Sequence, residues 1–212
     1  MNAREPIRLT AALLADAAED LARRDPLMRR ALDVAGMPRL GARSPGFHTL
    51  VRVICSQQVS VAAARTIDSR LEATLGQVTP AAVRAAGPRP LRAAGLSGRK
   101  TEYVLGLADA IEARRLSLRR VARLPDEPAI AELIQIRGIG RWTAEIYLMF
   151  ALRRPDLWPV DDLAVVSAYA RLRGSATRPG RDEMIELGAA WRPWRSVAAR
   201  LLWQFYLHAP PV

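Results

Sequence analysis

Hydrophobic residues recur every three or four positions along most of the chain, the spacing that gathers side chains on one face of an α-helix. Strict alternation of apolar and polar residues, which is typical of a β-strand, is hard to find. Clusters of Gly and Pro interrupt the helical pattern and predict about ten helices. These breaks fall at 25–28, 36–46, 76–80, 87–90, 95–98, 123–128, 137–140, 153–159 and 173–180. The pattern therefore predicts an all-α fold.

Two helix starts carry explicit capping signals. Thr79 precedes Pro80, and Asp126 precedes Glu127 and Pro128, which places a capping residue type ahead of a proline suited to the first helical turn. Tandem repeats are not evident. The most loop-like segment, 36–46, has an ordinary length for a connection within a compact domain, so we expect residues 1–212 to form a single domain.

The charge balance points to a polyanionic partner. The 212 residues are 50% hydrophobic, enough for a real core, and 32 basic residues against 21 acidic ones give a formal net charge of +11. Nucleic acid is the leading class of partner for such a chain. An arginine-rich composition inherited from a biased genome would produce the same balance, so charge alone leaves both interpretations open.

The inventory of reactive side chains excludes several chemistries. Lys100 is the only lysine, and Cys55 is the only cysteine. One cysteine cannot build a disulfide framework, and together with His48 and His208 it cannot supply a zinc tetrahedron or a four-cysteine iron–sulfur cluster. We therefore expect no cofactor and no metal bound by side chains.

Hydropathy gives no sign of a membrane protein. Acidic residues at Asp16, Glu19 and Asp20 interrupt the N-terminal segment, which is therefore not a signal peptide. The longest apolar run, residues 146–152, is far too short to span a bilayer. A cytoplasmic location is expected by default.

The strongest motif is LIQIRGIGRWTAEIYLMFAL, within residues 128–152. A short helix is expected to end near Ile136, a tight turn to follow at Arg137–Gly140, and a second helix to begin around Arg141. Two glycines one residue apart permit the turn, and the amides that begin the second helix can receive a phosphate at its positive dipole end. An ordinary connection between two helices remains the alternative, because a lone GxG is a weak signal.

A pair of carboxylates, Asp161 and Asp162, stands between Pro159 and the apolar segment LAVVSAYARL. Helix-start rules place a capping carboxylate here, and the pattern alone favours a purely structural cap.

LIQIRGIGRWTA resembles the helix-hairpin-helix of the base-excision DNA glycosylases (the HhH-GPD superfamily), and most closely that of the 3-methyladenine DNA glycosylase II type. Four further segments resemble the same family in the same order: 50–67, 95–111, 158–165 and 191–203. The resemblance implies a two-lobed helical fold with the active-site cleft between the lobes. Some members of this family add an N-terminal β-rich domain, and this chain is expected to lack one.

The resemblance also implies roles for individual residues. Asp162 would be the catalytic carboxylate, which leaves Asp161 as the expected helix cap. Trp142 and Trp203 would line the pocket for the flipped base, whereas Trp191 and Trp194 are assigned to the core. Predicted DNA contacts are Gln57, Gln58, Arg137, Gly138, Ile139, Gly140, Arg141 and Thr143, and carbonyls around Ile134, Ile136 and Ile139 would hold a monovalent cation when DNA is bound.

Gln58 matches the position whose side chain fills the hole left in the base stack. Where one branch of the family has leucine, this chain has a polar amide. Gln57 would contact the DNA backbone or a base. Solvation at a helix N-terminus is an equally good interpretation of both glutamines.

The implied activity is removal of alkylated purines from double-stranded DNA by a monomeric, monofunctional enzyme that leaves an abasic site. A carboxylate would stabilise the cationic sugar, and the positive charge of an alkylated base makes it a good leaving group. Bifunctional relatives attack with a lysine directly after the hairpin, a position occupied here by Trp142. Alternatives are an endonuclease III-type enzyme, disfavoured by the missing lysine and cysteine cluster, and a non-catalytic hairpin module that only tethers DNA.

Overall fold

The computed structural model describes residues 6–41 and 43–208, and within these ranges the chain forms helices and no β-strand. The all-α prediction is confirmed, although the thirteen helices exceed the expected number because short helices form between closely spaced Gly and Pro residues. They are α1 (Ala11–Arg24), α2 (Pro26–Ala35), α3 (Phe47–Ser56), α4 (Val61–Leu75), α5 (Pro80–Ala86), α6 (Pro88–Ala93), α7 (Gly98–Glu112), α8 (Leu118–Val121), α9 (Asp126–Leu133), α10 (Arg141–Phe150), α11 (Leu163–Leu172), α12 (Arg181–Ala190) and α13 (Arg195–His208).

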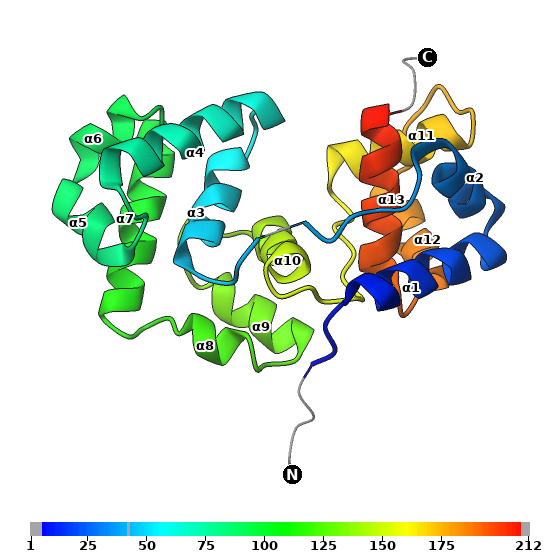
Figure 1. Ribbon diagram of the computed structural model, residues 1–212, viewed down its shortest axis with the longest axis horizontal. Helices are drawn as coiled ribbons and strands as arrows, with labels where there is room; N and C mark the ends of the chain where they lie inside the picture. Colours follow the sequence, from blue (N-terminus) through cyan, green and yellow to red (C-terminus); the bar gives the residue numbers. More distant parts are fainter. Residues whose placement is uncertain (1–5, 42, 209–212) are drawn as a thin grey trace, which may run out of the picture. The chain divides into compact units, whose positions relative to one another are not determined.

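The helices group into two compact units (Figure 1). Of the described residues, the first contains Pro6 and 43–147, and the second contains 7–41 together with 148–208. The boundary falls inside α10, between Tyr147 and Leu148. The hairpin turn, residues 137–140, lies in the first unit with the start of α10, and both Asp161 and Asp162 lie in the second.

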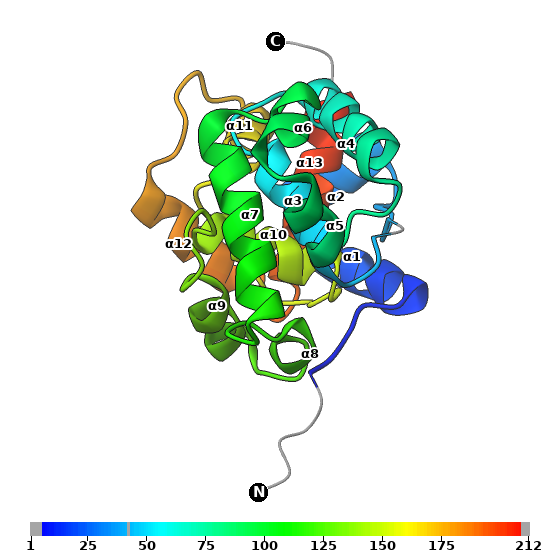
Figure 2. The ribbon, with the colours of Figure 1, turned by 90° about the vertical axis from the view of Figure 1, so that its left-hand side faces the viewer.

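The first unit is built around α7, the long helix seen in front in Figure 2. Helices α3, α5 and α6 pack against it, while α4 packs against α3 and α8 against α9. Val104, Leu107, Ala108 and Ala110 of α7 are all buried, which is the one-sided pattern expected from helical periodicity. Thr101, one turn before Val104, is also buried, and its hydroxyl donates to the carbonyl of Ser97.

The second unit is organised around α13, which packs against α1, α2 and α11. Arg200 on this helix is only 4% exposed, and its guanidinium donates to the carbonyls of Arg39, Leu40 and Met149. The same group lies 4.3 Å from the ring centroid of Phe150. A buried arginine is tolerated when carbonyls and an aromatic face replace its hydration, so Arg200 fixes the chain segments around α13.

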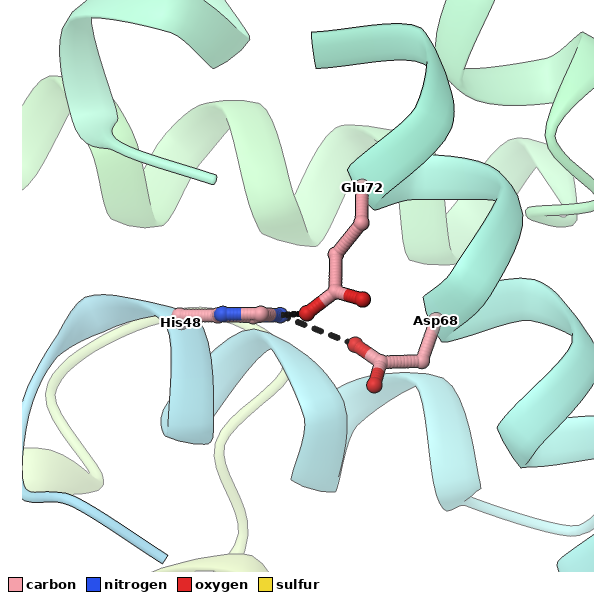
Figure 3. A group of neighbouring side chains, drawn as sticks. All are labelled: His48, Asp68 and Glu72. Atoms are coloured by element: carbon pink, nitrogen blue, oxygen red, sulfur yellow. Dashed lines mark hydrogen bonds and ion pairs between the residues drawn. The ribbon is translucent and has the colours of Figure 1, made fainter. Parts of the chain in front are cut away.

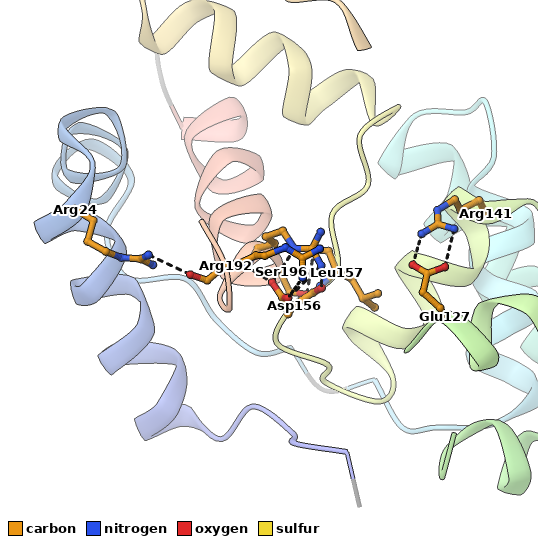
Figure 4. A network of polar contacts seen from close by, with 8 residues as sticks. Arg24, Glu127, Arg141, Asp156, Leu157, Arg192 and Ser196 are labelled. Atoms are coloured by element: carbon orange, nitrogen blue, oxygen red, sulfur yellow. Dashed lines mark hydrogen bonds and ion pairs between the residues drawn. The ribbon is translucent and has the colours of Figure 1, made fainter. Parts of the chain in front are cut away.

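Ion pairs stabilise the turn before α13. Asp156 accepts a hydrogen bond from Arg195 at 2.7 Å. It accepts another from Arg192 at 3.2 Å (Figure 4). Arg24 at the end of α1 donates to the carbonyl of Arg192. Trp191 is buried, as expected from the sequence, and its indole N–H donates to Asp25.

The predicted helix starts have different outcomes. Thr79 caps α5 by accepting the N–H of Ala82, with Pro80 as the first helical residue, as predicted. The prediction of Asp126 as a cap is wrong, because α9 begins at Asp126 itself and the capping position is Pro125. The carboxylate of Asp126 lies instead in the first turn, where the helix dipole favours negative charge.

Within the described residues, no helix is long and apolar enough to cross a membrane.

Packing around Trp158 predicts a large effect of a single methyl group. A Cβ added to Gly188 in α12 would lie 2.5 Å from Cδ1 of Trp158, whose indole N–H is fixed by the carbonyl of Met184. We expect Gly188→Ala to lower the free energy of unfolding by about 1–3 kcal/mol, the usual cost of overpacking. Gly106→Ala in α7, where a Cβ meets nothing within 4 Å, is the control and should be neutral or stabilising. Equal unfolding midpoints in urea for the two variants would contradict the prediction.

Candidate functional site

The hairpin turn follows α9 and has a shape that requires glycine at one position. Gly138 has φ of +91°, and a Cβ there would lie 2.1 Å from Cγ of Tyr103. Gly140 has no atom within 4 Å of an added Cβ. Ile139, between the two glycines, is buried and anchors the turn. The sequence motif thus contains one glycine that the fold requires and one that leaves open space.

Helix α10 begins directly after this turn, as predicted. The carbonyl of Gly140 accepts the N–H of Ala144, which is the first hydrogen bond of the helix. The amides of the first turn have no partner inside the helix, and they carry the positive end of its dipole. An anion such as a phosphate can be bound at this end without a side chain.

The two arginines of the hairpin differ in their surroundings. Arg141 donates to both carboxylate oxygens of Glu127 (Figure 4) and to Glu145, whose side chain is 6% exposed. The Arg137 side chain is 80% exposed and lies 3.5 Å from Glu102, whose side chain is 59% exposed. Arg137 therefore keeps its charge available at the surface, whereas the charge of Arg141 is compensated within the protein.

The glutamine loop between α3 and α4 lies against the hairpin. Gln57 ends α3, and its amide nitrogen donates to the carbonyl of Gly138 at 2.9 Å and to Oγ1 of Thr143 at 2.9 Å. Gln58 is exposed, with a left-handed φ of 54°. Gln57 therefore does not solvate a helix N-terminus, because its amide is bound by the hairpin and Ser60 caps α4. For the exposed Gln58 the two interpretations from the sequence stay open.

Thr143 was predicted to contact DNA, and the structure places its side chain inside the protein. It is 2% exposed and receives the hydrogen bond from Gln57. Its role in the structure is to support the glutamine loop.

Lys100 also supports this loop. The residue lies in the first turn of α7, directly after the break predicted at 95–98. Its Nζ donates to the carbonyls of Cys55 at 2.8 Å and of Gln57 at 2.7 Å. Partial burial lowers the pKa of the Lys100 amine, and burial raises the pKa of the Cys55 thiol to about 12, which keeps this cysteine protonated and unreactive.

Asp162 is the N-cap of α11. Its Oδ1 accepts the backbone N–H groups of Ala164 and Val165, each at 3.0 Å, and the indole N–H of Trp203 at 2.9 Å. The side chain of Asp161 is instead 60% exposed and pairs with Arg181 at 3.1 Å. The expectation that Asp161 caps the helix is therefore wrong.

Trp203 belongs to α13, which packs against α11 and so brings its indole to Asp162. Its ring lies 5.3 Å from that of Phe150 in a tilted arrangement. The second unit therefore holds a buried carboxylate, 8% exposed, bound by the N–H edge of an indole. Such a pair can stabilise a developing cation in a site poor in water. The other predicted pocket residue, Trp142, is half-buried in the first turn of α10, in the first unit.

A further cluster, which the sequence analysis did not identify, joins α3 to α4. His48 Nε2 lies 2.9 Å from Asp68 and 3.6 Å from Glu72 (Figure 3). The ligand types would suit a metal ion, but the guanidinium of Arg52 already binds both carboxylates. The cluster is therefore an ion-pair network between two helices. Its signal in the sequence is the four-residue spacing within each helix, which is common on helix surfaces.

Comparison with known proteins places these features in a family. Residues 51–193 match the model of the HhH-GPD superfamily base excision DNA repair proteins. The DNA-3-methyladenine glycosylase of Bacillus subtilis is 30% identical over 203 residues, which are 87% of this chain and 65% of the relative. The chain thus spans slightly less than two thirds of that relative.

Solved structures share the fold. The 3-methyladenine DNA glycosylase of Schizosaccharomyces pombe, in a complex with abasic DNA, superimposes with a TM-score of 0.81 at 32% identity, covering 89% of this chain and 95% of that one. An 8-oxoguanine glycosylase/lyase of Clostridium acetobutylicum has a TM-score of 0.78 at 18% identity, over 91% of this chain and 69% of that one, and so shows the fold alone.

The capping role of Asp162 can be separated from any chemical role by its variants. Asp162→Ala removes the acceptor for two backbone amides and should lower the free energy of unfolding by about 0.5–2 kcal/mol. Asp162→Asn keeps a capping oxygen, and we expect stability close to that of the wild type. Chemical denaturation monitored by circular dichroism measures both, with Asp161→Ala as the neutral control. A loss of stability for Asp161→Ala that exceeds that of Asp162→Ala would reverse the assignment of the cap.

Proposed function

Because the chain belongs to the HhH-GPD superfamily of base excision DNA repair proteins, we propose that it is a monofunctional DNA N-glycosylase that removes alkylated bases from duplex DNA. 3-Methyladenine and 7-methylguanine are the proposed substrates, and an abasic site is the product. The names of the Bacillus subtilis and Schizosaccharomyces pombe relatives support this substrate class.

The observation that carries the proposal is the fixed carboxylate of Asp162. Three donors converge on its Oδ1, two from the start of α11 and one from Trp203, so the orientation of the carboxylate is set before DNA binds. A preorganised charge stabilises a transition state without the cost of reorienting during the reaction.

The reaction breaks the bond between C1′ of deoxyribose and a nitrogen of the base. The bonding electrons leave with the base, and C1′ becomes electron-deficient, with an oxocarbenium-like sugar. Asp162 stabilises this positive charge and orients the water whose oxygen bonds to C1′, while the proton of that water passes to the carboxylate or to solvent. A base alkylated at N3 or N7 carries positive charge before cleavage and departs neutral, so a single acidic residue suffices.

Trp203, which lies in the second unit together with Asp162, is proposed to hold the flipped base. A base must leave the duplex before its glycosidic bond becomes accessible. Electron-deficient alkylated purines are attracted to indole faces in the way cations are, by about 0.5–2 kcal/mol. Trp203 has a second function, because its N–H is one of the three donors that orient Asp162.

The hairpin is proposed to bind the DNA backbone. The amides that begin α10 suit a phosphate, and the exposed guanidinium of Arg137 suits another. A monovalent cation at the carbonyls of Ile134, Ile136 and Ile139 would suit this turn, since the carbonyl of Ile136 accepts the N–H of Ile139 and a carbonyl oxygen has a second lone pair. Such an ion would add positive charge beside the phosphate.

Replacing the carboxylate tests the chemical role directly. We expect Asp162→Asn to lower the single-turnover rate of base release by about two to three orders of magnitude, as removal of a group that stabilises charge in a transition state typically does. Binding to undamaged DNA should be unchanged. Asp161→Asn is the matched control, and release of 7-methylguanine from a methylated duplex is the measurement. Equal losses for both variants would remove the assignment, and no release by the wild type would refute the proposed function.

The shape of the hairpin turn, which depends on Gly138, should be required for DNA binding. Gly138→Ala is strained by its backbone conformation and clashes with Tyr103, so the turn must shift. We expect affinity for lesion and undamaged duplexes to fall together, since phosphate contacts carry no sequence information. Gly106→Ala in α7, where an added Cβ also meets no atom and which lies outside the hairpin, is the control and should bind within about twofold of the wild type. Fluorescence anisotropy measures both, and a change of lesion preference at constant affinity would contradict a backbone contact.

The monofunctional assignment predicts that borohydride traps no covalent complex between the protein and DNA. A lyase needs an amine at C1′ that can lose its proton, which arginine cannot provide. Trp142 stands at the position of the nucleophilic lysine in bifunctional relatives, and the Lys100 amine is bound to two carbonyls. Incubation with abasic and alkylated duplexes under borohydride, followed by denaturing electrophoresis, tests this. Trapping that disappears in Lys100→Ala would show that Lys100 is a nucleophile.

A further inference from the structure

We propose that Lys100 and Gln57 are positioning residues that fix the glutamine loop to the hairpin, so that the surface that binds phosphate and the side chain that enters the base stack move as one body. The inference rests on the proposed function and extends it to two residues in the first unit. Neither residue needs to touch the reacting atoms for this role.

The first observation is the pair of hydrogen bonds made by the Gln57 amide. One reaches the carbonyl of Gly138 in the turn, and the other reaches Thr143 in the first turn of α10, each at 2.9 Å. The two acceptors stand on either side of the amides proposed to bind phosphate. Gln57 therefore binds the hairpin at two points, and the residue is half-buried.

The second observation is the position of the only lysine. The last carbonyls of a helix lack partners within it, and the negative end of its dipole attracts a cation. Lys100 satisfies two such carbonyls at the end of α3, those of Cys55 and Gln57. A compact ammonium with three donors fits this arrangement, whereas a planar guanidinium presents its donors in a rigid fork. Every other basic residue in the chain is arginine.

The third observation is the conformation of Gln58, the residue that follows. Its φ of 54° lies in the left-handed region, which costs a residue with a side chain about 1–2 kcal/mol. Contacts on the preceding residue must compensate for that cost. Gln57 supplies them, because its side chain is bound by the hairpin and its carbonyl by Lys100. Gln58 is thereby presented exposed and in a defined direction.

This arrangement predicts a defect in base extrusion rather than in bond cleavage. Insertion of a side chain matters most when the lesion is paired and stacked, because an unpaired base costs less to extrude. Loss of either positioning residue should therefore slow the removal of a paired lesion and have little effect on an unpaired one. A role in global stability alone would affect both substrates alike.

The experiment compares single-turnover release of 7-methylguanine placed opposite cytosine with release from a single-base bulge. For Lys100→Met and Gln57→Leu we expect a loss of roughly tenfold or more on the paired lesion and less than about threefold on the bulge. Lys100→Arg should remain impaired, because a guanidinium does not reproduce the ammonium geometry. Gln58→Ala should show the same substrate dependence. The double variant with Gln57→Leu should be little slower than either single variant, since both changes impair the same step, insertion of the Gln58 side chain.

Arg115→Met and Gln77→Leu are controls that remove one charge and one amide at exposed positions outside the loop and the hairpin. Equal losses on the paired and bulged substrates, or rates equal to those of the controls, would overturn the proposal. If a variant does not fold by circular dichroism, the remaining one, together with Lys100→Arg, decides the question. Failure of the wild type to release the base from either substrate would instead refute the proposed function.

Discussion

The convergence of three donors on Oδ1 of Asp162 is the constraint on which the proposed chemistry depends. The same carboxylate caps the N-terminus of α11 and is bound by Trp203 of α13, so its position is set by the packing of these two helices. Removing an anion from water is costly unless hydrogen bonds replace the solvent, and these three do so. The structural and chemical interpretations of this residue, which are alternatives in the sequence, are therefore compatible in the structure.

The first unit applies a related principle to the backbone. Gly138 allows the turn to approach Tyr103, and its carbonyl is then presented to Gln57. Lys100 completes the arrangement from the start of α7. Side chains of the glutamine loop thus support the turn, and the turn supports the loop. Such mutual support allows an exposed segment to hold a defined conformation without a hydrophobic core of its own.

Local signals predicted much of this structure, and distant contacts account for what they missed. Helical periodicity gave the fold class, and the glycines with the following apolar run placed the start of α10 correctly at Arg141. The prediction of Asp161 as the cap failed because the helix begins one residue later than expected. Asp162 therefore binds the first amides of α11, and Asp161 is exposed. The bond from Gln57 to Gly138 joins residues 81 positions apart, and no local pattern encodes such a pairing.

Glu127 and Glu145 neutralise the charge of Arg141 within the protein. This changes what the net charge of the chain implies for DNA binding. Many arginines here serve as intramolecular connectors: Arg200 and Arg24 bind carbonyls, and Arg52 joins two helices. The number of counterions that a protein releases from DNA depends on how many phosphates it neutralises, and not on how many basic residues it contains. The formal charge of +11 is therefore a poor guide to the dependence of DNA affinity on salt, since part of the cationic inventory already serves to hold the fold together.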